Sequence, residues 1–400
     1  MRDAIVVLNA GSSSLKFGLY PASAEAFAGA PLWRGRIERI GDAASWSAAG
    51  SAADVPATPL GEHGRDHARA LAFLLEEIGS RFPDLQIAAA GHRVVHGGTR
   101  FAGPARIDDA VRAEIQRLVP LAPRHQPHGL AAIAALAEQR RDLLQVACFD
   151  TAFHRSQDPL AERFGLPSSL HEEGVRRYGF HGLSYEAVAA QLPRVLSERA
   201  DGKVVVAHLG NGASLAALRA RRSVATTMGL TPLDGLLMGT RPGALDPGVL
   251  LYLLREHGYD EARLSALLYD ESGLLGVSGS SHDMQDLLVD AGEAAATAVA
   301  LFVQRLVQEV ASMAGALDGL DALVFTGGIG ERSAEVRARA CGRLAWLGIA
   351  LSAEANAAHA ERIEAPGSAI AVAVVATDEE AVIAEQTWRV WRDGPASARA

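Results

Sequence analysis

Cysteine, positive charge and long apolar runs are all scarce in this chain. Its 400 residues include only two cysteines, Cys148 and Cys341, neither in a C-x-x-C motif. A disulfide framework is therefore excluded, and both are expected to be reduced thiols in the core. Aspartate plus glutamate (47) outnumber lysine plus arginine (38), which gives a formal net charge of -9. This balance disfavours nucleic acid and acidic membrane surfaces as partners, because both attract basic proteins.

Signals for export or membrane insertion are missing as well. No run of ~18 uncharged apolar residues predicts a membrane-spanning helix. The first apolar run begins at Ile5, which leaves no space for the charged and apolar regions of a signal peptide. We therefore expect a cytoplasmic protein without a membrane anchor. The length and the 49% hydrophobic content predict two domains, each able to bury a core.

The sequence does contain a repeated pattern, half a chain apart. Residues 5–20 and 204–218 each have an apolar run, a turn of glycine, serine or asparagine, and a second apolar run, and Ser14-Leu15 aligns with Ser214-Leu215. Each pattern predicts a hairpin whose turn offers N–H groups and hydroxyls to a phosphate, and the pair indicates a duplicated protein. The alternative is a chance match of two ordinary hairpins. The commoner phosphate loop, G-x-x-x-x-G-K-[ST], is absent.

Strands and helices alternate through both halves, which predicts an α/β fold. We expect one domain at residues 1–150 and a second at 151–384, with the C-terminal helix (385–400) packing on the first. The expected helices include 67–80, 107–118, 130–138, 185–192 ending at Pro193, 248–257, 261–268, 291–317 and 378–391.

A predicted strand at 87–96 carries the first candidate for substrate binding. Alternation places Arg93 and Val95 on one face, with His92 and His96 on the other. A cation beside a small apolar side chain suits a short carboxylate, which needs a charge partner for its head and a dry wall for its tail. The alternative for Arg93 is a structural role at a sheet edge. We interpret both histidines as structural rather than as metal ligands.

Glycine-flanked loops present two further polar side chains. His181 lies in Gly-Phe-His-Gly and Arg241 in Gly-Thr-Arg-Pro-Gly. Side chains held this way can meet the charge that spreads over a phosphoryl group during transfer. The Gly-Gly-Ile-Gly loop at 327–330 follows a strand and precedes a predicted helix, so it is a candidate nucleotide loop, although Ser333 replaces the third glycine of a dinucleotide fingerprint.

Acidic residues follow the last predicted strand, at Asp378, Glu379 and Glu380. One of these carboxylates could hold Mg²⁺ through water. The alternative is that they are solvated charges at a helix N-terminus, where the helix dipole favours them.

Taken together, these segments resemble the acetate kinases, within the acetate/propionate kinase group of the actin-like kinase superfamily. The resemblance runs nearly end to end and implies a duplicated two-domain actin-like ATPase (ribonuclease H-like) fold with a central cleft. It also implies a homodimer that uses ATP and Mg²⁺ to phosphorylate acetate reversibly, giving acetyl phosphate and ADP, with propionate as the alternative acid. The motifs that carry it are 9–16, 92–98, 149–154, 178–183, 208–214, 227–248, 326–331 and 377–380.

The resemblance implies roles for individual residues. Asp150 matches the essential catalytic carboxylate, and His181 and Arg241 match transition-state stabilisers. Asn9 and Glu379 match the residues that hold Mg²⁺, with Mn²⁺ as an alternative ion. The implied substrate-binding residues are Arg93, Val95, Phe180, Pro232 and His125. The implied ATP contacts are Ser12, Ser14, Lys16, His208, Leu209, Gly210, Asn211, Gly212, Asp283, Met284, Gln285, Gly328, Ile329, Gly330, Glu331 and Arg332.

Elementary chemistry refines the role of Asp150. A carboxylic acid substrate has a pKa close to that of glutamate, about 4.3, and is already ionised at neutral pH. The reaction therefore needs no general base, and we expect Asp150 to orient Mg²⁺ or the γ-phosphate.

The chain departs from the family pattern at several positions. Arg124 replaces a usual hydrophobic residue before the active-site histidine: if it faces the pocket, a different acid becomes possible, and if it points to solvent nothing changes. Gln285 and Arg332 alter the nucleotide stretches, which leaves pyrophosphate as an alternative donor. Pro242 and Ala244 stiffen the loop of Arg241. A nucleotide-binding regulator without catalysis is the remaining alternative, and it would have no need of the acceptor and phosphoryl residues.

Overall fold

The computed structural model describes residues 1–23 and 30–394, and the chain forms two compact units. Unit 1 comprises residues 1–153 together with the C-terminal segment that begins at Asp378, and unit 2 comprises His154–Thr377. Unit 2 therefore begins close to the domain boundary expected near residue 150, and it ends at Thr377, seven residues before the expected end at 384. Residues 395–400 of the expected C-terminal helix lie outside the described residues.

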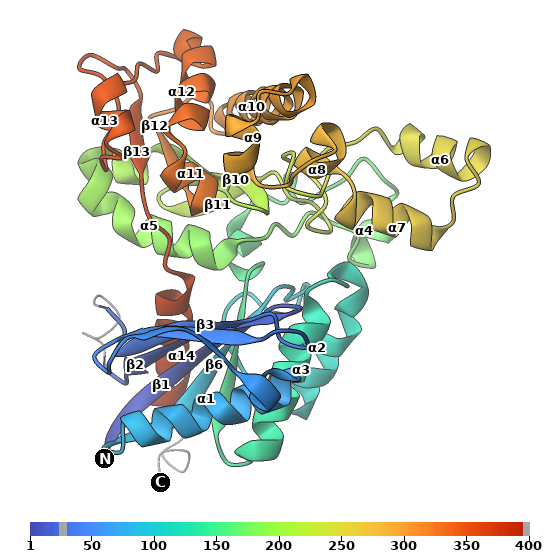
Figure 1. Ribbon diagram of the computed structural model, residues 1–400. Coiled ribbons are helices and arrows are strands. Elements are labelled where there is room, and N and C mark those ends of the chain that lie inside the picture. Colours follow the sequence, from blue (N-terminus) through green and yellow to red (C-terminus); the bar gives the residue numbers. More distant parts are fainter. Residues whose placement is uncertain (24–29, 395–400) are drawn as a thin grey trace. The chain divides into compact units, whose positions relative to one another are not determined.

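Unit 1 is built on a sheet of eight strands in the order β5-β4-β3-β2-β1-β6-β8-β7 (Figure 1). The strand β1 lies between β2, which is antiparallel to it, and β6, which is parallel, and β8 extends the parallel part. Strands β1 and β8 are apolar along most of their length because both faces of the sheet are covered here. The strands are β1 (Arg2–Ala10), β2 (Ser14–Pro21), β3 (Trp33–Glu38), β4 (Ser45–Gly50), β5 (Val55–Pro59), β6 (Leu85–Val94), β7 (Ala105–Arg106) and β8 (Leu144–Phe149).

Unit 2 repeats the central part of this sheet. Its five strands have the order β11-β10-β9-β12-β13, and the directions match those of β3-β2-β1-β6-β8: two antiparallel pairs, then two parallel ones. The duplication predicted from the two hairpins is therefore confirmed. The strands are β9 (Lys203–Leu209), β10 (Ala213–Arg219), β11 (Arg222–Thr226), β12 (Ala322–Thr326) and β13 (Ala371–Val374).

The residue alignment between the two hairpins is wrong, however. The first turn lies between the paired residues Ala10 and Leu15, whereas the second lies between Leu209 and Ala213. Because the second turn is one residue shorter, Leu15 corresponds in the ladder to Ala213 rather than to Leu215.

Helices cover both faces of the unit 1 sheet. The helix α14 (Glu379–Asp393) packs on β1, β6 and β8, and α3 (Gln126–Gln139), with α1 (His67–Arg81) beside it, covers the other face. Gly91 allows the close approach of α14, because a Cβ at this position would lie 2.2 Å from the Thr387 hydroxyl. The short helix α2 (Asp109–Arg117) completes this unit.

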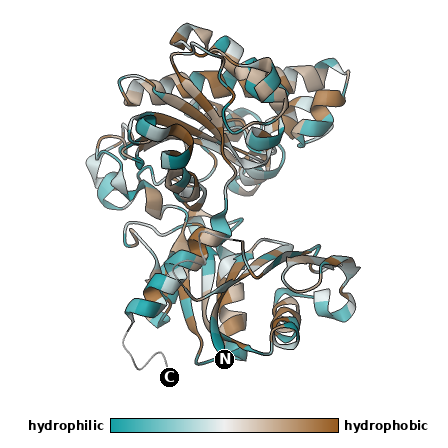
Figure 2. Cartoon of the chain, turned by 90° about the vertical axis from the view of Figure 1, so that its left-hand side faces the viewer, coloured by the Kyte–Doolittle hydropathy of each residue, from teal (hydrophilic) through white to brown (hydrophobic). Residues whose placement is uncertain are grey.

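The longest helix of unit 2 is α10 (Glu293–Ala316). Among the described residues it alone is long and apolar enough to cross a membrane by length and composition. Its apolar side chains, such as Phe302, Leu306 and Val310, are buried against β9, β10 and β11, so it is accounted for as a core helix. In Figure 2 the apolar residues are concentrated in the strands and in the inner faces of the helices within each unit.

The other helices of unit 2 differ from expectation in two places. The helix α5 (Gly182–Leu196) continues past Pro193. The Pro193 carbonyl still accepts a hydrogen bond from Ser197 N, so the helix loses only the hydrogen bond that the missing N–H of proline would have donated. The predicted glycine loop at 327–330 is the start of a short helix, α11 (Gly327–Arg332). The remaining helices are α4 (Ser168–Glu172), α6 (Pro247–Glu256), α7 (Glu261–Asp270), α8 (Gly273–Ser278), α9 (Met284–Val289), α12 (Ala334–Arg343) and α13 (Ala353–Ala357).

Each unit has a deeply buried histidine, and this makes stability depend on pH. Burial lowers the pKa of His92, in unit 1, and of His154, in unit 2, to about 4, although the hydrogen bonds of His92 with the Gln145 side chain and of His154 to the Phe180 carbonyl oppose the effect. In the unfolded chain the same groups protonate near 6.5. We expect the free energy of unfolding to be intact above about pH 6.5 and to fall towards pH 4, by on the order of 3 kcal/mol per histidine.

Urea unfolding between pH 7.5 and 4.5 measures this dependence. His92→Gln should flatten the loss of stability with falling pH, whereas His257→Gln, at an exposed position, should leave it unchanged. Equal slopes for the two variants would contradict the assignment.

Candidate active site

A pocket of about 310 Å³ lies in unit 1, where the parallel strands β1, β6 and β8 end. Asn9 is near the end of β1, Arg93 is near the end of β6, and Asp150 directly follows β8. Neighbouring parallel strands bring their carboxyl ends to one edge of the sheet, so the strand arrangement alone places these three side chains close together. The predicted residues in the pocket lining are Asn9, Ser12, Ser14, Lys16, Arg93, Val95, Arg124 and His125.

Arg93 is the centre of this pocket's charge. Its Nε donates to both Asp150 carboxylate oxygens at 3.2 Å, and its Nη2 donates to Oδ2 at 2.7 Å. Its Nη1 lies 3.7 Å from Glu379 Oε2, beyond hydrogen-bond distance. Asp150 is 1% exposed, whereas the Arg93 side chain is 24% exposed. The buried carboxylate therefore fixes one edge of the guanidinium and leaves the other edge towards the pocket.

Burial and the neighbouring charges together determine the pKa values of Arg93 and Asp150. Burial lowers the pKa of Arg93, but the neighbouring Asp150 and Glu379 carboxylates more than reverse this and raise it above its usual value. For Asp150, burial raises the pKa, the Arg93 guanidinium opposes that rise, and the Glu379 charge adds to it. Arg93 is thus a permanent cation between two carboxylates.

The strand that carries Arg93 ends earlier than the sequence indicated. The strand was expected to reach residue 96, but β6 ends at Val94. Both Val94 and Val95 then reach the pocket, instead of pointing to opposite faces. His92 and His96 are 1% and 0% exposed and lie in the core, in keeping with their interpretation as structural residues.

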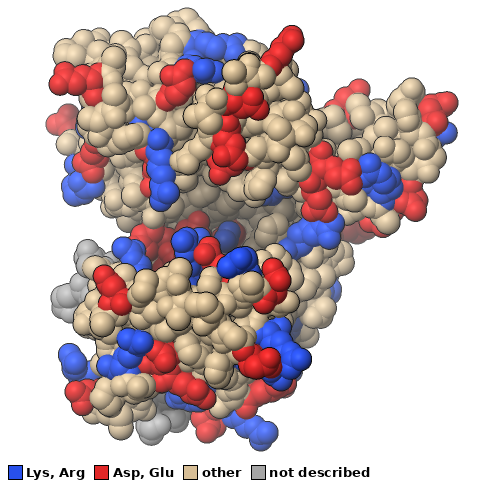
Figure 3. Space-filling model, in the orientation of Figure 1, with Lys and Arg blue, Asp and Glu red and all other residues tan. Residues whose placement is uncertain are grey.

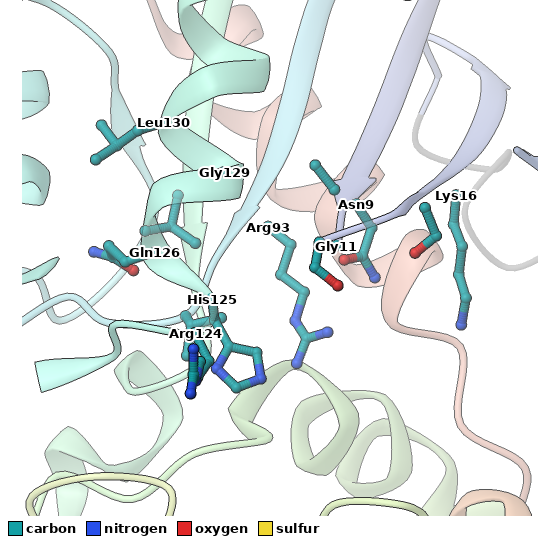
Figure 4. A pocket seen from close by; sticks show the side chains of 14 residues that line it. Asn9, Gly11, Lys16, Arg93, Arg124, His125, Gln126, Gly129 and Leu130 are labelled. Atoms are coloured by element: carbon teal, nitrogen blue, oxygen red, sulfur yellow. The ribbon is translucent and has the colours of Figure 1, made fainter. Parts of the chain in front are cut away.

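Gln126, which the sequence analysis missed, positions His125. The Gln126 side chain is 2% exposed; its Oε1 accepts from His96 N at 3.1 Å and its Nε2 donates to His96 O at 2.9 Å. This clamp joins the start of α3 to the exit of β6. Figure 4 shows the His125 ring beside the Arg93 guanidinium, with Arg124 next to His125 in the same lining.

The oxygen donors of unit 1 suit a magnesium ion bound together with phosphate. Asn9 supplies an amide oxygen, and Asp150 and Glu379 supply carboxylates on either side of Arg93. Within residues 1–23 and 30–394, no group of three or more His, Cys, Asp or Glu side chains could hold a metal alone. Mg²⁺ commonly binds through one or two carboxylates, waters and substrate phosphates, so this sparse set fits.

The second group of candidate residues lies in unit 2, around His181. This residue has φ 58° and ψ 24°, a left-handed conformation, directly before α5. Its Nδ1 lies 2.9 Å from the Ser214 hydroxyl, and its ring stacks on His208 with centroids 4.3 Å apart. His208 is held in turn by the Ser184 hydroxyl at 2.8 Å. Both imidazoles are therefore fixed in orientation.

Arg241 lies against the same backbone as His181. A Cβ at Gly212 would be 2.9 Å from Arg241 Nη2 and 3.2 Å from His181 Nε2, so both side chains lie directly against this glycine and a larger residue there would displace the Arg241 guanidinium. Arg241 Nη1 donates to the Pro232 carbonyl at 2.7 Å. Burial lowers the pKa of Arg241 to about 10, which leaves it a cation at neutral pH. The pair can therefore face developing negative charge on a phosphoryl group.

The three stretches expected to bind ATP converge on a second pocket in unit 2, of about 300 Å³. His282 and Ser333, which were not predicted as ATP contacts, also line it; His282 adjoins a predicted stretch, and Ser333 is the residue at the third-glycine position of the fingerprint. The lining consists of Gly210, Asn211, His282, Asp283, Met284, Gln285, Gly328, Ile329, Arg332 and Ser333.

Several expected ATP and substrate residues lie outside both pocket linings. Leu209 and Gly330 are buried, and the Glu331 carboxylate accepts from Gly327 N at 3.0 Å. Phe180 is 1% exposed, and its carbonyl contacts His154 Nε2 at 2.9 Å. These residues support the loops that carry their neighbours.

Comparison with known proteins gives one consistent result. A model of the acetokinase family matches residues 4–385. The chain is 49% identical over 393 residues to an acetate kinase of Rhodopseudomonas palustris (strain TIE-1), covering 98% of this chain and 99% of that protein. It is 45% identical over 394 residues to an acetate kinase of Rhizobium meliloti, covering 96% of this chain and 98% of that protein.

Solved structures agree with this result. A propionate kinase from Francisella tularensis subsp. tularensis SCHU S4 matches with a TM-score of 0.89 at 34% sequence identity. An acetate kinase from Porphyromonas gingivalis matches with a TM-score of 0.84, also at 34% sequence identity. Each comparison covers 97% of this chain and 99% of the other. The expected duplicated actin-like ATPase fold is confirmed, and the chain belongs to the acetokinase family.

Proposed function

We propose that this protein transfers the γ-phosphoryl group of ATP to acetate, reversibly, giving acetyl phosphate and ADP. The observation that carries the proposal is the Arg93 guanidinium, fixed on one edge by buried Asp150 and open to a pocket on the other. Membership of the acetokinase family and the convergence of three nucleotide stretches in unit 2 support it.

The unit 1 pocket would bind the acceptor through charge. Asp150 occupies Nε and Nη2 of Arg93, and Glu379 lies near Nη1 but beyond hydrogen-bond distance, so the Nη1 hydrogens can still be donated to a substrate carboxylate. Val95 lines the same pocket and offers an apolar surface to a short alkyl group. The acid is already ionised when it binds, so the main obstacle is the electrostatic repulsion between the substrate carboxylate and the phosphates of ATP. The positive charges of Arg93 and Lys16 reduce this repulsion.

The unit 2 residues would act on the transferred group. His181 and Arg241, both beside Gly212, would stabilise charge on the phosphoryl oxygens during an in-line displacement. Asn9, Asp150 and Glu379 would hold Mg²⁺, or Mn²⁺ as an alternative, which when bound neutralises phosphate charge. Asp150 would thus hold both Arg93 and the ion in place, without removing a proton from the acid.

A hydroxylamine trap for acyl phosphate tests the activity. With Mg²⁺-ATP and formate, acetate, propionate, butyrate or succinate, we expect signal with acetate first and propionate second. Signal only with pyrophosphate in place of ATP would favour the alternative donor, since Gln285 and Arg332 both line the nucleotide pocket. No signal with either donor would reject the kinase function in favour of a nucleotide-binding regulator.

Substitution of Asp150 is the companion experiment. Asp150→Asn should lower kcat by about 100-fold or more, with a much smaller change in acetate KM, because orientation is lost while Arg93 remains. Asp109→Asn, at a side chain that is 97% exposed, is the matched control. A rise in acetate KM with unchanged kcat would instead make Asp150 a binding residue only.

Arg124 bears on the choice of acid, because it lines the acceptor pocket and is also exposed to solvent. Arg124→Leu should raise kcat/KM for propionate relative to acetate by about fourfold, since ~0.8 kcal/mol is gained per buried methylene. Arg124→Lys, which keeps the charge, should retain the original ratio. Equal ratios in both variants would show that Arg124 does not contact the substrate tail.

Homodimer formation belongs to the same proposal. None of the residues of α6 is buried, and several of its large apolar side chains are exposed, including Leu251 (51%) and Tyr252 (57%). In Figure 1, α6 and α7 extend away from the rest of unit 2. Exposed apolar surface of this kind marks an interaction site, and a second copy of the chain is the occupant we infer.

Sedimentation of an α6 variant tests the dimer. We expect twice the 42.0 kDa chain mass for the wild type and a shift towards the single-chain mass for the double variant Leu251→Glu with Tyr252→Glu. Trp346→Glu, at an exposed apolar residue elsewhere in unit 2, is the control and should remain dimeric. A monomeric wild type would refute the inference.

The remaining partners are small molecules. In Figure 3 positive and negative side chains are interspersed over the visible face, without an extended basic patch of the kind nucleic acid requires. The two cysteines, Cys148 and Cys341, are free and buried. Reduced thiols and the use of ATP support a cytoplasmic location.

A further inference from the structure

Arg337 is a cation with no exposed surface. It lies in α12, in unit 2, at 0% exposure, and its guanidinium donates to backbone carbonyls and to the Asn356 side chain rather than to a carboxylate. Its Nε donates to Asn356 Oδ1 at 2.8 Å and its Nη2 to Asn356 O at 2.9 Å. Its Nη2 also lies 3.1 Å from His359 Nδ1. Burying a charge among neutral groups is costly, so its retention indicates a specific task.

The task is visible at the end of α11. Arg337 Nη1 donates to Gly330 O at 2.8 Å and to Glu331 O at 2.9 Å, two carbonyls in the last turn of that helix. A helix of six residues is not stable by itself, and a cation at its C-terminal end complements both the free carbonyls and the helix dipole. Arg337 therefore supplies stability that α11 lacks.

A second charged side chain holds the other end of α11. Glu331 Oε1 accepts from Gly327 N at 3.0 Å and lies 3.4 Å from Thr377 N, the last residue of unit 2. The carboxylate thus satisfies an N–H group at the helix start, where negative charge is favourable. Both ends of α11 are held by charges of the sign that the helix dipole favours.

The helix held in this way forms one wall of the nucleotide pocket. Gly328, Ile329 and Arg332 line that pocket, whereas Glu331 and Arg337 do not. We propose that Arg337 is a positioning residue for the nucleotide, and that Glu331 acts with it by fixing α11 instead of contacting ATP. This rests on the proposed use of ATP by unit 2.

Loss of Arg337 should weaken nucleotide binding selectively. Without the two carbonyl contacts, α11 must be ordered when the nucleotide binds, and that cost reduces affinity. The acceptor pocket contains no residue of α11, α12 or α13, so acetate binding should be unaffected. We expect Arg337→Met to raise the KM for ATP and the Kd for ADP at least about tenfold, with the KM for acetate within about twofold of wild type.

Three further variants separate positioning from general stability. Arg337→Lys should recover only part of the ADP affinity, because one ammonium cannot reach the Asn356 side chain and both carbonyls. Arg339→Gln removes an exposed arginine of the same helix, paired with Glu335 at 2.7 Å, and should change neither constant. Glu331→Gln keeps an acceptor oxygen, so it should raise the KM for ATP less than Glu331→Ala does.

The measurements are calorimetric titration of the full chain with ADP, steady-state kinetics, and hydrogen exchange of residues 327–332. Faster exchange in Arg337→Met, reversed by saturating ADP, would support the proposal. Unchanged ADP affinity, an equal rise in both KM values, or equal effects of the two Glu331 variants would overturn it. If Arg337→Met does not fold, Asn356→Ala, which removes one anchor of the guanidinium, must show the same selective loss. ADP binding is measurable even if the wild type makes no acetyl phosphate, so the two proposals fail separately.

Discussion

The buried ion pair between Arg93 and Asp150 is the interaction on which the acceptor half of this protein depends. Asp150 has almost no exposed surface, and a carboxylate in that position is tolerated only with a close, hydrogen-bonded cation. The parallel pairing of β6 with β8, with Val94 opposite Phe149, brings the two side chains together. The sheet register places the pair, and Glu379 on α14 adds a second negative charge beside Arg93.

Duplication explains how the two halves divide the work. The same strand order appears in both units, so both have parallel strands whose carboxyl ends face a hairpin turn. The turns then diverged. In unit 1 the neighbouring side chains are Asn9, Lys16 and Arg93, which suit an anion and an ion, whereas in unit 2 they are His181, His208 and Arg241.

Sequence patterns predicted the parts that depend on neighbouring residues. Apolar runs on either side of a turn of glycine, serine or asparagine predicted both hairpins, and glycines on each side marked His181, which has a left-handed conformation. Gln126, Arg337 and Asn356 were missed, because their role comes from hydrogen bonds to residues distant along the chain. The α11 helix was missed for a related reason: a glycine-rich segment has low helix propensity, and only the contacts at its two ends make it helical.

Unit 1 is made of two separate stretches of the chain, and this has a consequence for its biosynthesis. Gly91 and Cys148 lie on a sheet face that α14 covers, and α14 follows more than two hundred residues after β8. On the ribosome, unit 2 is complete before that face is closed and before Glu379 reaches Arg93. The nascent chain must therefore carry an open apolar groove throughout the synthesis of unit 2, and truncation just before α14 would leave that groove exposed for association with chaperones or with other chains.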